Sequence, residues 1–112
     1  MNLLLIGIAS YYSIAGCLGC PPHYDQNGIY YLMNNGDRLN DTVKIVALTP
    51  ANYRKYKNQM VKITNLKNNK YTLAKVADSG GFGKKNRVAD LSLATKNAID
   101  CSDLCKVRIE GR

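Results

Sequence analysis

Residues 61–92, VKITNLKNNKYTLAKVADSGGFGKKNRVADLS, decide the fold of this chain. Apolar and polar residues alternate over residues 60–66, which predicts a half-buried strand, and residues 71–77 return as its partner. Asn68 and Asn69 between them suit a two-residue hairpin turn, because asparagine tolerates a positive φ. The second strand ends at Asp78, and a glycine-rich loop follows. We therefore expect an acid at the end of a strand, beside a loop that lets a ligand approach the backbone.

Outside this stretch, the apolar pattern predicts four further short strands, over residues 3–13, 29–33, 43–48 and 106–110. Ser92 is a suitable N-cap for a helix that runs through Ile99. Residues 51–59 form a polar, tyrosine-rich connector with room for one helical turn. Six short strands, frequent turns and one or two short helices predict a mainly β fold, a small closed or nearly closed barrel.

The length of 112 residues predicts a single domain over residues 1–112. Its least regular part is a long cysteine-containing loop, residues 14–42, in which glycine, proline and asparagine mark turns. A loop of this length in a small domain is usually functional or disordered. The apolar residues 3–13 are too few to span a bilayer, so we expect no membrane span.

The net charge is +8, and most of the excess of lysine and arginine falls in the second half. A basic domain favours a polyanionic partner such as nucleic acid, an anionic wall polymer or a membrane, and solubility alone is the other interpretation. We expect no nucleic-acid partner, since no recognised stacking motif is present. Eight tyrosines against one phenylalanine and no tryptophan suit clefts that stack on sugar rings.

The four cysteines form two close pairs, Cys17 with Cys20 and Cys101 with Cys105. Their positions at opposite ends of a small domain favour one or two disulfides that tie the termini together in an oxidising compartment. A zinc site and free thiols are the alternatives. Residues 14–17, IAGC, also resemble the lipid-attachment box of bacterial lipoproteins. His23, in the long loop, is interpreted as an exposed residue, and we expect no metal site and no cofactor.

Two aspartates are the candidates for chemistry. Asp78, at the lip of a barrel, would have a raised pKa and serve as a general acid, or it would cap its loop by accepting backbone N–H bonds. Asp90 would face the same groove, or it would support the start of the following helix through the macrodipole.

The chain resembles the double-psi β-barrel domain of the rare lipoprotein A family of septal-ring lytic transglycosylases, which is related more distantly to barwin, expansins and family 45 endoglucanases. The matching pieces follow the family's order and cover nearly the whole chain. They are residues 7–13 (GIASYYS), 47–49 (ALT), 61–66 (VKITNL), 76–82 (VADSGGF) and 87–92 (RVADLS). The resemblance implies a six-stranded double-psi β-barrel.

The resemblance also implies roles for individual residues. Asp78 matches the family's acid in the strand-end motif, and Asp90 matches the acid that lies in the polysaccharide groove of the expansin and endoglucanase relatives. The family's histidine position is Asn52 here, and an asparagine cannot shuttle a proton near neutral pH. We expect the sugar to be positioned by Asn52, Asp90, Tyr12, Ser79, Gly80 and Phe82.

Two functions are therefore predicted. The first is a lytic transglycosylase that cleaves peptidoglycan strands without water, with Asp78 as acid and then base. The alternative is a non-catalytic, expansin-like module that binds wall polysaccharide. Both imply peptidoglycan or another wall polysaccharide as partner, an extracytoplasmic location, and, we expect, a monomer.

Overall fold

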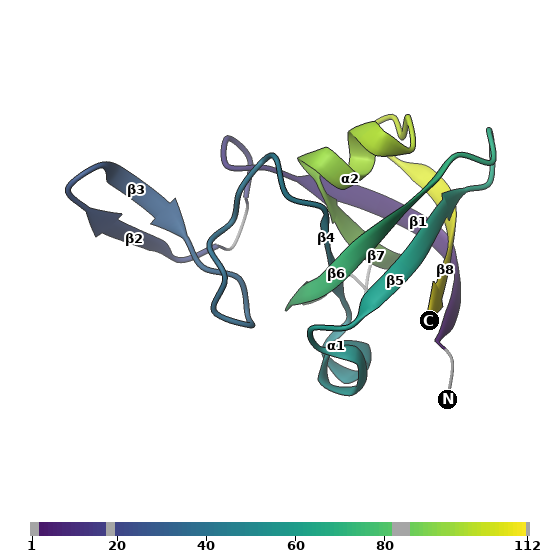
Figure 1. Ribbon diagram of the computed structural model, residues 1–112, viewed down its shortest axis with the longest axis horizontal. Coiled ribbons are helices and arrows are strands. Elements are labelled where there is room, and N and C mark those ends of the chain that lie inside the picture. The colour runs from purple at the N-terminus through teal and green to yellow at the C-terminus, as the bar shows by residue number, and fades with distance from the viewer. Residues whose placement is uncertain (1–2, 18–19, 82–85, 112) are drawn as a thin grey trace.

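Six strands close into a barrel in the computed structural model of the chain, which describes residues 3–17, 20–81 and 86–111. The barrel strands are β1 (Leu4–Tyr12), β4 (Ile45–Leu48), β5 (Met60–Asn65), β6 (Tyr71–Ser79), β7 (Arg87–Ser92) and β8 (Cys105–Gly111). Their order around the barrel is β1-β7-β4-β6-β5-β8 (Figure 1). The pairs β1·β7 and β4·β6 are parallel, whereas the other described pairs in the barrel are antiparallel. The prediction of a mainly β, six-stranded double-psi barrel is confirmed.

A separate hairpin lies outside the barrel. It consists of β2 (Pro22–Asp25) and β3 (Gly28–Tyr31), and it projects from one side of the molecule (Figure 1). Residues 29–33 were expected to be one of the six barrel strands, and that assignment is wrong. The sixth barrel strand is β7, which the apolar pattern does not reveal because Arg87 and Asp90 interrupt it. Charged residues are depleted in strands, and these two face a pocket rather than the core.

Two short helices complete the described fold. Helix α1 (Pro50–Tyr56) fills most of the expected connector and is anchored by its buried Tyr53 and Tyr56. Helix α2 (Leu93–Ala98) begins at the predicted N-cap, since the Ser92 side chain accepts a hydrogen bond from the Thr95 backbone N–H. Neither helix is long and apolar enough to cross a bilayer, within the described residues.

The barrel interior is filled by aliphatic side chains that alternate along the strands. The fully buried ones include Val46, Leu48, Val61, Ile63, Val76, Leu91, Val107 and Ile109. Burial of one such side chain stabilises a fold by about 1.5–3 kcal/mol. A second, smaller apolar cluster lies outside the barrel wall and holds part of the long loop against it. It contains Tyr12, Met33, Leu39, Ile45, Ala47 and Ala77.

Each parallel strand pair contains one register shift. Val46 pairs with Val76 but Ala47 pairs with Asp78, so Ala77 is an extra residue on β6. Likewise Val88 is an extra residue on β7, between the positions paired with β1. An extra residue of this kind, a β-bulge, changes the face to which the following side chains point. After the bulges, Asp78 and Asp90 lie on the outer face of the barrel wall instead of in the core.

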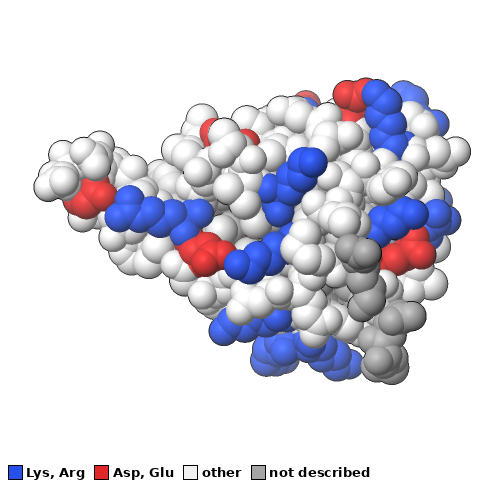
Figure 2. Space-filling view, viewed as in Figure 1, with Lys and Arg blue, Asp and Glu red and all other residues white. Residues whose placement is uncertain are grey.

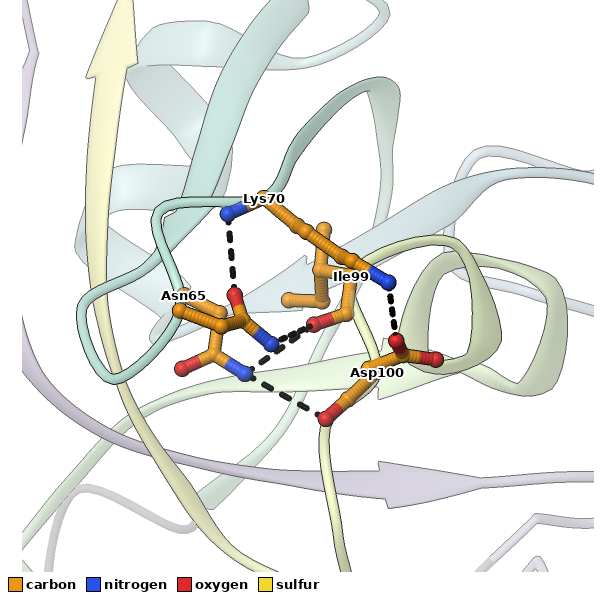
Figure 3. A network of polar contacts seen from close by, with 5 residues as sticks. Asn65, Lys70, Ile99 and Asp100 are labelled. Carbon is orange, nitrogen blue, oxygen red and sulfur yellow. Dashed lines mark hydrogen bonds and ion pairs between the residues drawn. The ribbon is translucent and has the colours of Figure 1, made fainter.

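The β5–β6 hairpin is as predicted, but its loop covers residues 66–70 rather than Asn68 and Asn69 alone. Asn69 has the expected positive φ of 62°. The buried Asn65 side chain ties this hairpin to the loop after α2, because its Nδ2 donates to the carbonyl oxygens of Ile99 and Asp100 at 3.0 and 3.4 Å (Figure 3).

Two disulfides are present, Cys17–Cys20 and Cys101–Cys105. The Cα atoms are 5.5 Å apart in the first pair and 5.6 Å apart in the second, within the range that a disulfide spans. Disulfides are thus confirmed, but the expectation that they tie the two ends of the domain together is wrong. Each bond closes a short loop within its own pair.

Candidate functional site

Four residues on four adjacent strands form a row across the barrel wall. Ser10 on β1 pairs with Asp90 on β7, Asp90 pairs with Ala47 on β4, and Ala47 pairs with Asp78 on β6. Neighbouring strands lie about 4.8 Å apart, so the two aspartates are separated by two strand spacings, about 10 Å. Only the methyl group of Ala47 stands between them in the row. The wall therefore presents two carboxyl groups on either side of the buried Ala47.

This row forms one side of a pocket of about 780 Å³. The barrel contributes Ser10, Tyr12, Asp78, Ser79, Arg87 and Asp90, among others. The opposite side comes from the long loop and its hairpin, with Cys17, Cys20, Pro21, His23, Met33 and Asn34. The loop that was expected to be functional or disordered is thus the second wall of the site.

Asp78 is held by three hydrogen bonds. Its Oδ1 accepts from the backbone N–H groups of Asn34 and Ser79, both at 2.9 Å, and its Oδ2 accepts from the Tyr12 hydroxyl at 3.4 Å. Partial burial nevertheless raises the pKa of Asp78, against the opposing effect of these donors. The Asp78 carboxyl is therefore both fixed in position and easier to protonate than an ordinary aspartate.

The Tyr12 phenol stays protonated in this environment. Burial, followed by the negative charges of Asp78 and Asp90, raises the pKa of Tyr12 far above its usual value. The hydroxyl also contacts the Met33 sulfur at 3.8 Å. Tyr12 thus acts as a permanent hydrogen-bond donor to Asp78.

Asp90 has a different set of neighbours. Its Oδ1 accepts a hydrogen bond from the Ser10 hydroxyl at 3.0 Å. Partial burial raises its pKa, the Ser10 hydrogen bond and the positive charge of Arg87 lower it, and the charge of Asp78 raises it further. Asp90 lies within β7, before the Ser92 N-cap, so its interpretation as a helix-start residue is wrong.

The long loop, which forms the second wall of the pocket, is hydrogen-bonded directly to β6, the strand that carries Asp78. The Asn34 amide donates to the Ser79 hydroxyl at 2.6 Å, and the Asn35 backbone N–H donates to the Ala77 carbonyl at 3.0 Å. Met33 and Leu39 are buried against the outer face of the barrel. These contacts hold the two walls of the pocket at a defined separation.

The structure brings together five of the predicted site residues, namely Tyr12, Asp78, Ser79, Gly80 and Asp90. It does not place Asn52 with them: Asn52 lies on α1, its amide donates to the Thr49 hydroxyl at 3.3 Å, and it is absent from the described pocket lining. Phe82 lies outside the described residues. His23 lines the pocket, although the sequence indicated an exposed loop residue.

Several pocket residues are missing from the sequence prediction, among them Ser10, Asn34, Ala47 and Arg87. Ser10 and Arg87 lie within the segments GIASYYS and RVADLS, which match the family. That match was the signal that could have identified them. Their place beside Asp90 depends on strand register. Asn34 belongs to a turn whose packing against β6 has no local signature.

The chain matches no protein-family model and no curated protein. Among solved structures it is similar to the crystal structure of an apo expansin from Clavibacter michiganensis, with a TM-score of 0.63 and 18% sequence identity. The match covers 96% of this chain and 49% of that chain, so this chain spans about half the length of the expansin. The likeness is one of fold. This likeness of fold agrees with the distant relation to expansins that the predicted resemblance included, whereas no comparison supports the lipoprotein A family itself.

Proposed function

We propose that this chain is an expansin-like module that binds wall polysaccharide in the pocket between the barrel and the long loop. The observation that carries the proposal is the row of Ser10, Asp90, Ala47 and Asp78 along one wall of an open pocket. The fold shared with an expansin adds support.

The pocket chemistry suits sugar hydroxyl groups. Each carboxylate retains acceptor capacity beyond the bonds that it makes within the protein, since an ionised carboxylate has about four lone-pair sites. Asp78 and Asp90 would accept hydrogen bonds from sugar hydroxyls that reach this wall of the pocket. Tyr11 also lines the pocket and is 37% exposed, and the Lys96 ammonium lies over its ring at 4.7 Å from the centroid.

The proposed partner is peptidoglycan or another wall polysaccharide, and the proposed location is extracytoplasmic. The two disulfides support such a location, because disulfides persist in oxidising compartments.

Co-sedimentation with purified sacculi and with insoluble cellulose tests the binding proposal. We expect the wild type to pellet with at least one polymer, and Asp90→Ala to bind about tenfold more weakly because it loses a hydroxyl acceptor in the pocket. Asp103→Ala is the matched control, since it removes the same charge from an exposed position away from the pocket. A wild-type protein that stays in the supernatant with every polymer contradicts the proposal.

A second candidate is lytic transglycosylase activity, which the burial-raised pKa of Asp78 favours. In this reaction, protonated Asp78 would give its proton to the glycosidic oxygen as the C1–O bond breaks. The resulting carboxylate would then take the proton of the muramoyl 6-hydroxyl as the C1–O6 bond of the 1,6-anhydro ring forms. We place binding first because Asn52 has no titratable proton and does not line the described pocket.

Incubation with denuded glycan strands, followed by mass spectrometry, separates the two candidates. Catalysis predicts 1,6-anhydro-muramoyl products that disappear in Asp78→Asn. Intact glycan at high protein concentration, together with retained co-sedimentation, leaves binding as the function. Products that persist in Asp78→Asn contradict the assigned role of Asp78.

A further inference from the structure

Arg87 lies in the same pocket as the two aspartates, at the start of β7. It pairs with Ile8 of β1, and the residue that follows it, Val88, is the extra residue of the β-bulge. Without the bulge, residues three positions apart on a strand would point to opposite faces. With it, Arg87 and Asp90 face the same pocket.

The Arg87 guanidinium has no acceptor among the described residues. Its Nε is buried and makes no hydrogen bond, and no described carboxylate lies within ion-pair distance of it. Asp90 senses the positive charge of Arg87, which lowers the pKa of Asp90, but the two do not form a salt bridge. A half-buried guanidinium without acceptors costs free energy unless water or a ligand supplies them.

We propose that Arg87 forms a subsite for a carboxylate carried by the polysaccharide, so that the pocket prefers acidic polymers over neutral ones. This inference rests on the proposed binding function. The guanidinium presents a planar fork of donors that matches a carboxylate with two parallel hydrogen bonds. The sugar hydroxyls would occupy Asp90 and Asp78 while the carboxylate reaches Arg87.

The two aspartates restrict which anion this subsite accepts. Asp78 and Asp90 repel any negative group in the pocket, and the repulsion grows with the charge of that group. A singly charged carboxylate therefore fits better than a phosphate that carries close to two charges. Uronic acids and the lactyl ether of denuded peptidoglycan strands both supply such a carboxylate.

The binding experiment must separate Arg87 from the general basic charge of the protein. Lysine and arginine side chains are spread over the face shown in Figure 2, with several at the end formed by α1. Arg54→Gln is the matched control, because Arg54 is an exposed arginine on α1 outside the described pocket lining. The variants to compare are wild type, Arg87→Gln, Arg87→Lys and Arg54→Gln.

Affinity is measured by calorimetry at one fixed salt concentration for polygalacturonate, for the same polymer after carboxyl reduction, and for denuded glycan strands. We expect the wild type to bind at least one acidic polymer about tenfold more tightly than the reduced polymer. Arg87→Gln abolishes that preference with little change for the reduced polymer, and Arg87→Lys retains part of it. The acidic polymer that shows the preference identifies the source of the carboxylate.

The outcomes separate the two proposals. Equal losses in Arg87→Gln and Arg54→Gln would mean that bulk charge drives binding, and equal wild-type affinity for acidic and reduced polymers would mean that no carboxylate is recognised. Either result overturns the Arg87 subsite and leaves polysaccharide binding intact. Absence of wild-type binding to all three polymers overturns the subsite, and it contradicts the proposed function as well where sacculi and cellulose also leave the protein in the supernatant. The wild-type preference and the Arg87→Lys result test the subsite even where Arg87→Gln unfolds.

Discussion

Two polar clusters at different places on the barrel differ in how well their groups are satisfied. In the first, around Asn65, Nδ2 donates to the carbonyl oxygens of Ile99 and Asp100 (Figure 3). The Oδ1 of Asn65 also accepts from the Lys67 backbone N–H at 3.0 Å. In the second, the pocket, burial raises the pKa values of Asp78 and Asp90, and the Arg87 guanidinium has no acceptor among the described residues.

The difference indicates what each cluster does. A fully bonded polar network in a low-dielectric setting stabilises one conformation, whereas partly satisfied groups cost stability and remain available to a ligand. The Asn65 cluster is therefore structural, since it joins the β5–β6 hairpin to the loop after α2. On the proposed function, we expect the pocket to lose stability in exchange for ligand binding, as functional sites commonly do.

Replacement of Asn65 is the strongest test of this contrast. Asn65→Ala leaves the carbonyl oxygens of Ile99 and Asp100 and the Lys67 N–H without their partner in a buried site. We expect a loss of about 2–4 kcal/mol in the free energy of unfolding, measured by urea denaturation. The melting temperature should fall by about 10 °C.

Asn97→Ala is the control for this change, because Asn97 is exposed on α2 and its replacement should shift stability by less than about 0.5 kcal/mol. Similar effects of the two substitutions would contradict a structural role for the Asn65 cluster.

Each cluster has its own disulfide, and the two bonds should respond differently to removal. Cys101–Cys105 follows directly on Asp100, whereas Cys17 and Cys20 line the pocket. We expect the double alanine variant of Cys101 and Cys105 to lose about 2 kcal/mol of global stability, since even a short disulfide loop restricts the unfolded chain. Loss of the Cys17–Cys20 bond should instead weaken polysaccharide binding and change the barrel's melting temperature less.

Calorimetric melting and co-sedimentation of both double variants check this prediction. The contrast fails if removal of Cys17–Cys20 destabilises the barrel more, or if removal of Cys101–Cys105 alone impairs binding.

The sequence predicts the barrel better than the site because different physical signals define them. Alternation over β5 and β6 follows from burial of one strand face, so both strands and the position of Asp78 at the end of β6 are readable. Strand β7 is missed because Arg87 and Asp90 serve the pocket and break its alternation. A single extra residue in a strand, such as Ala77 or Val88, leaves no mark in the apolar pattern of the sequence. It nevertheless decides which side chains face the pocket. Asn52 was assigned by motif position, and the helix that carries it does not bring its amide to the described pocket.

The smallest expected effect concerns the stability that the protein loses by burying the Asp78 carboxylate in the pocket. Asp78→Asn keeps an oxygen for the Asn34 and Ser79 N–H groups, and its NH₂ can donate to the Tyr12 hydroxyl oxygen, but it removes a carboxylate whose burial raises its pKa. We expect the variant to be more stable than wild type by up to about 1 kcal/mol at pH 7, as is common when a functional site is neutralised. Its polysaccharide binding should be weaker.

The pH dependence of this difference has a definite sign. Because the pKa of Asp78 is raised in the folded state, the folded wild type binds a proton before the unfolded chain does, and its stability rises as pH falls through that pKa. The advantage of Asp78→Asn should therefore be greatest near pH 7 and fade toward pH ~4, the ordinary aspartate value.

Asp25→Asn is a control for which the opposite pH trend is expected. The Asn27 backbone N–H and Arg38 lower the pKa of the exposed Asp25, so any advantage of wild type over that variant is present at neutral pH and is lost on acidification. Urea denaturation across this pH range measures both trends, and parallel curves for Asp78→Asn and wild type would show that the Asp78 carboxyl carries no burial cost.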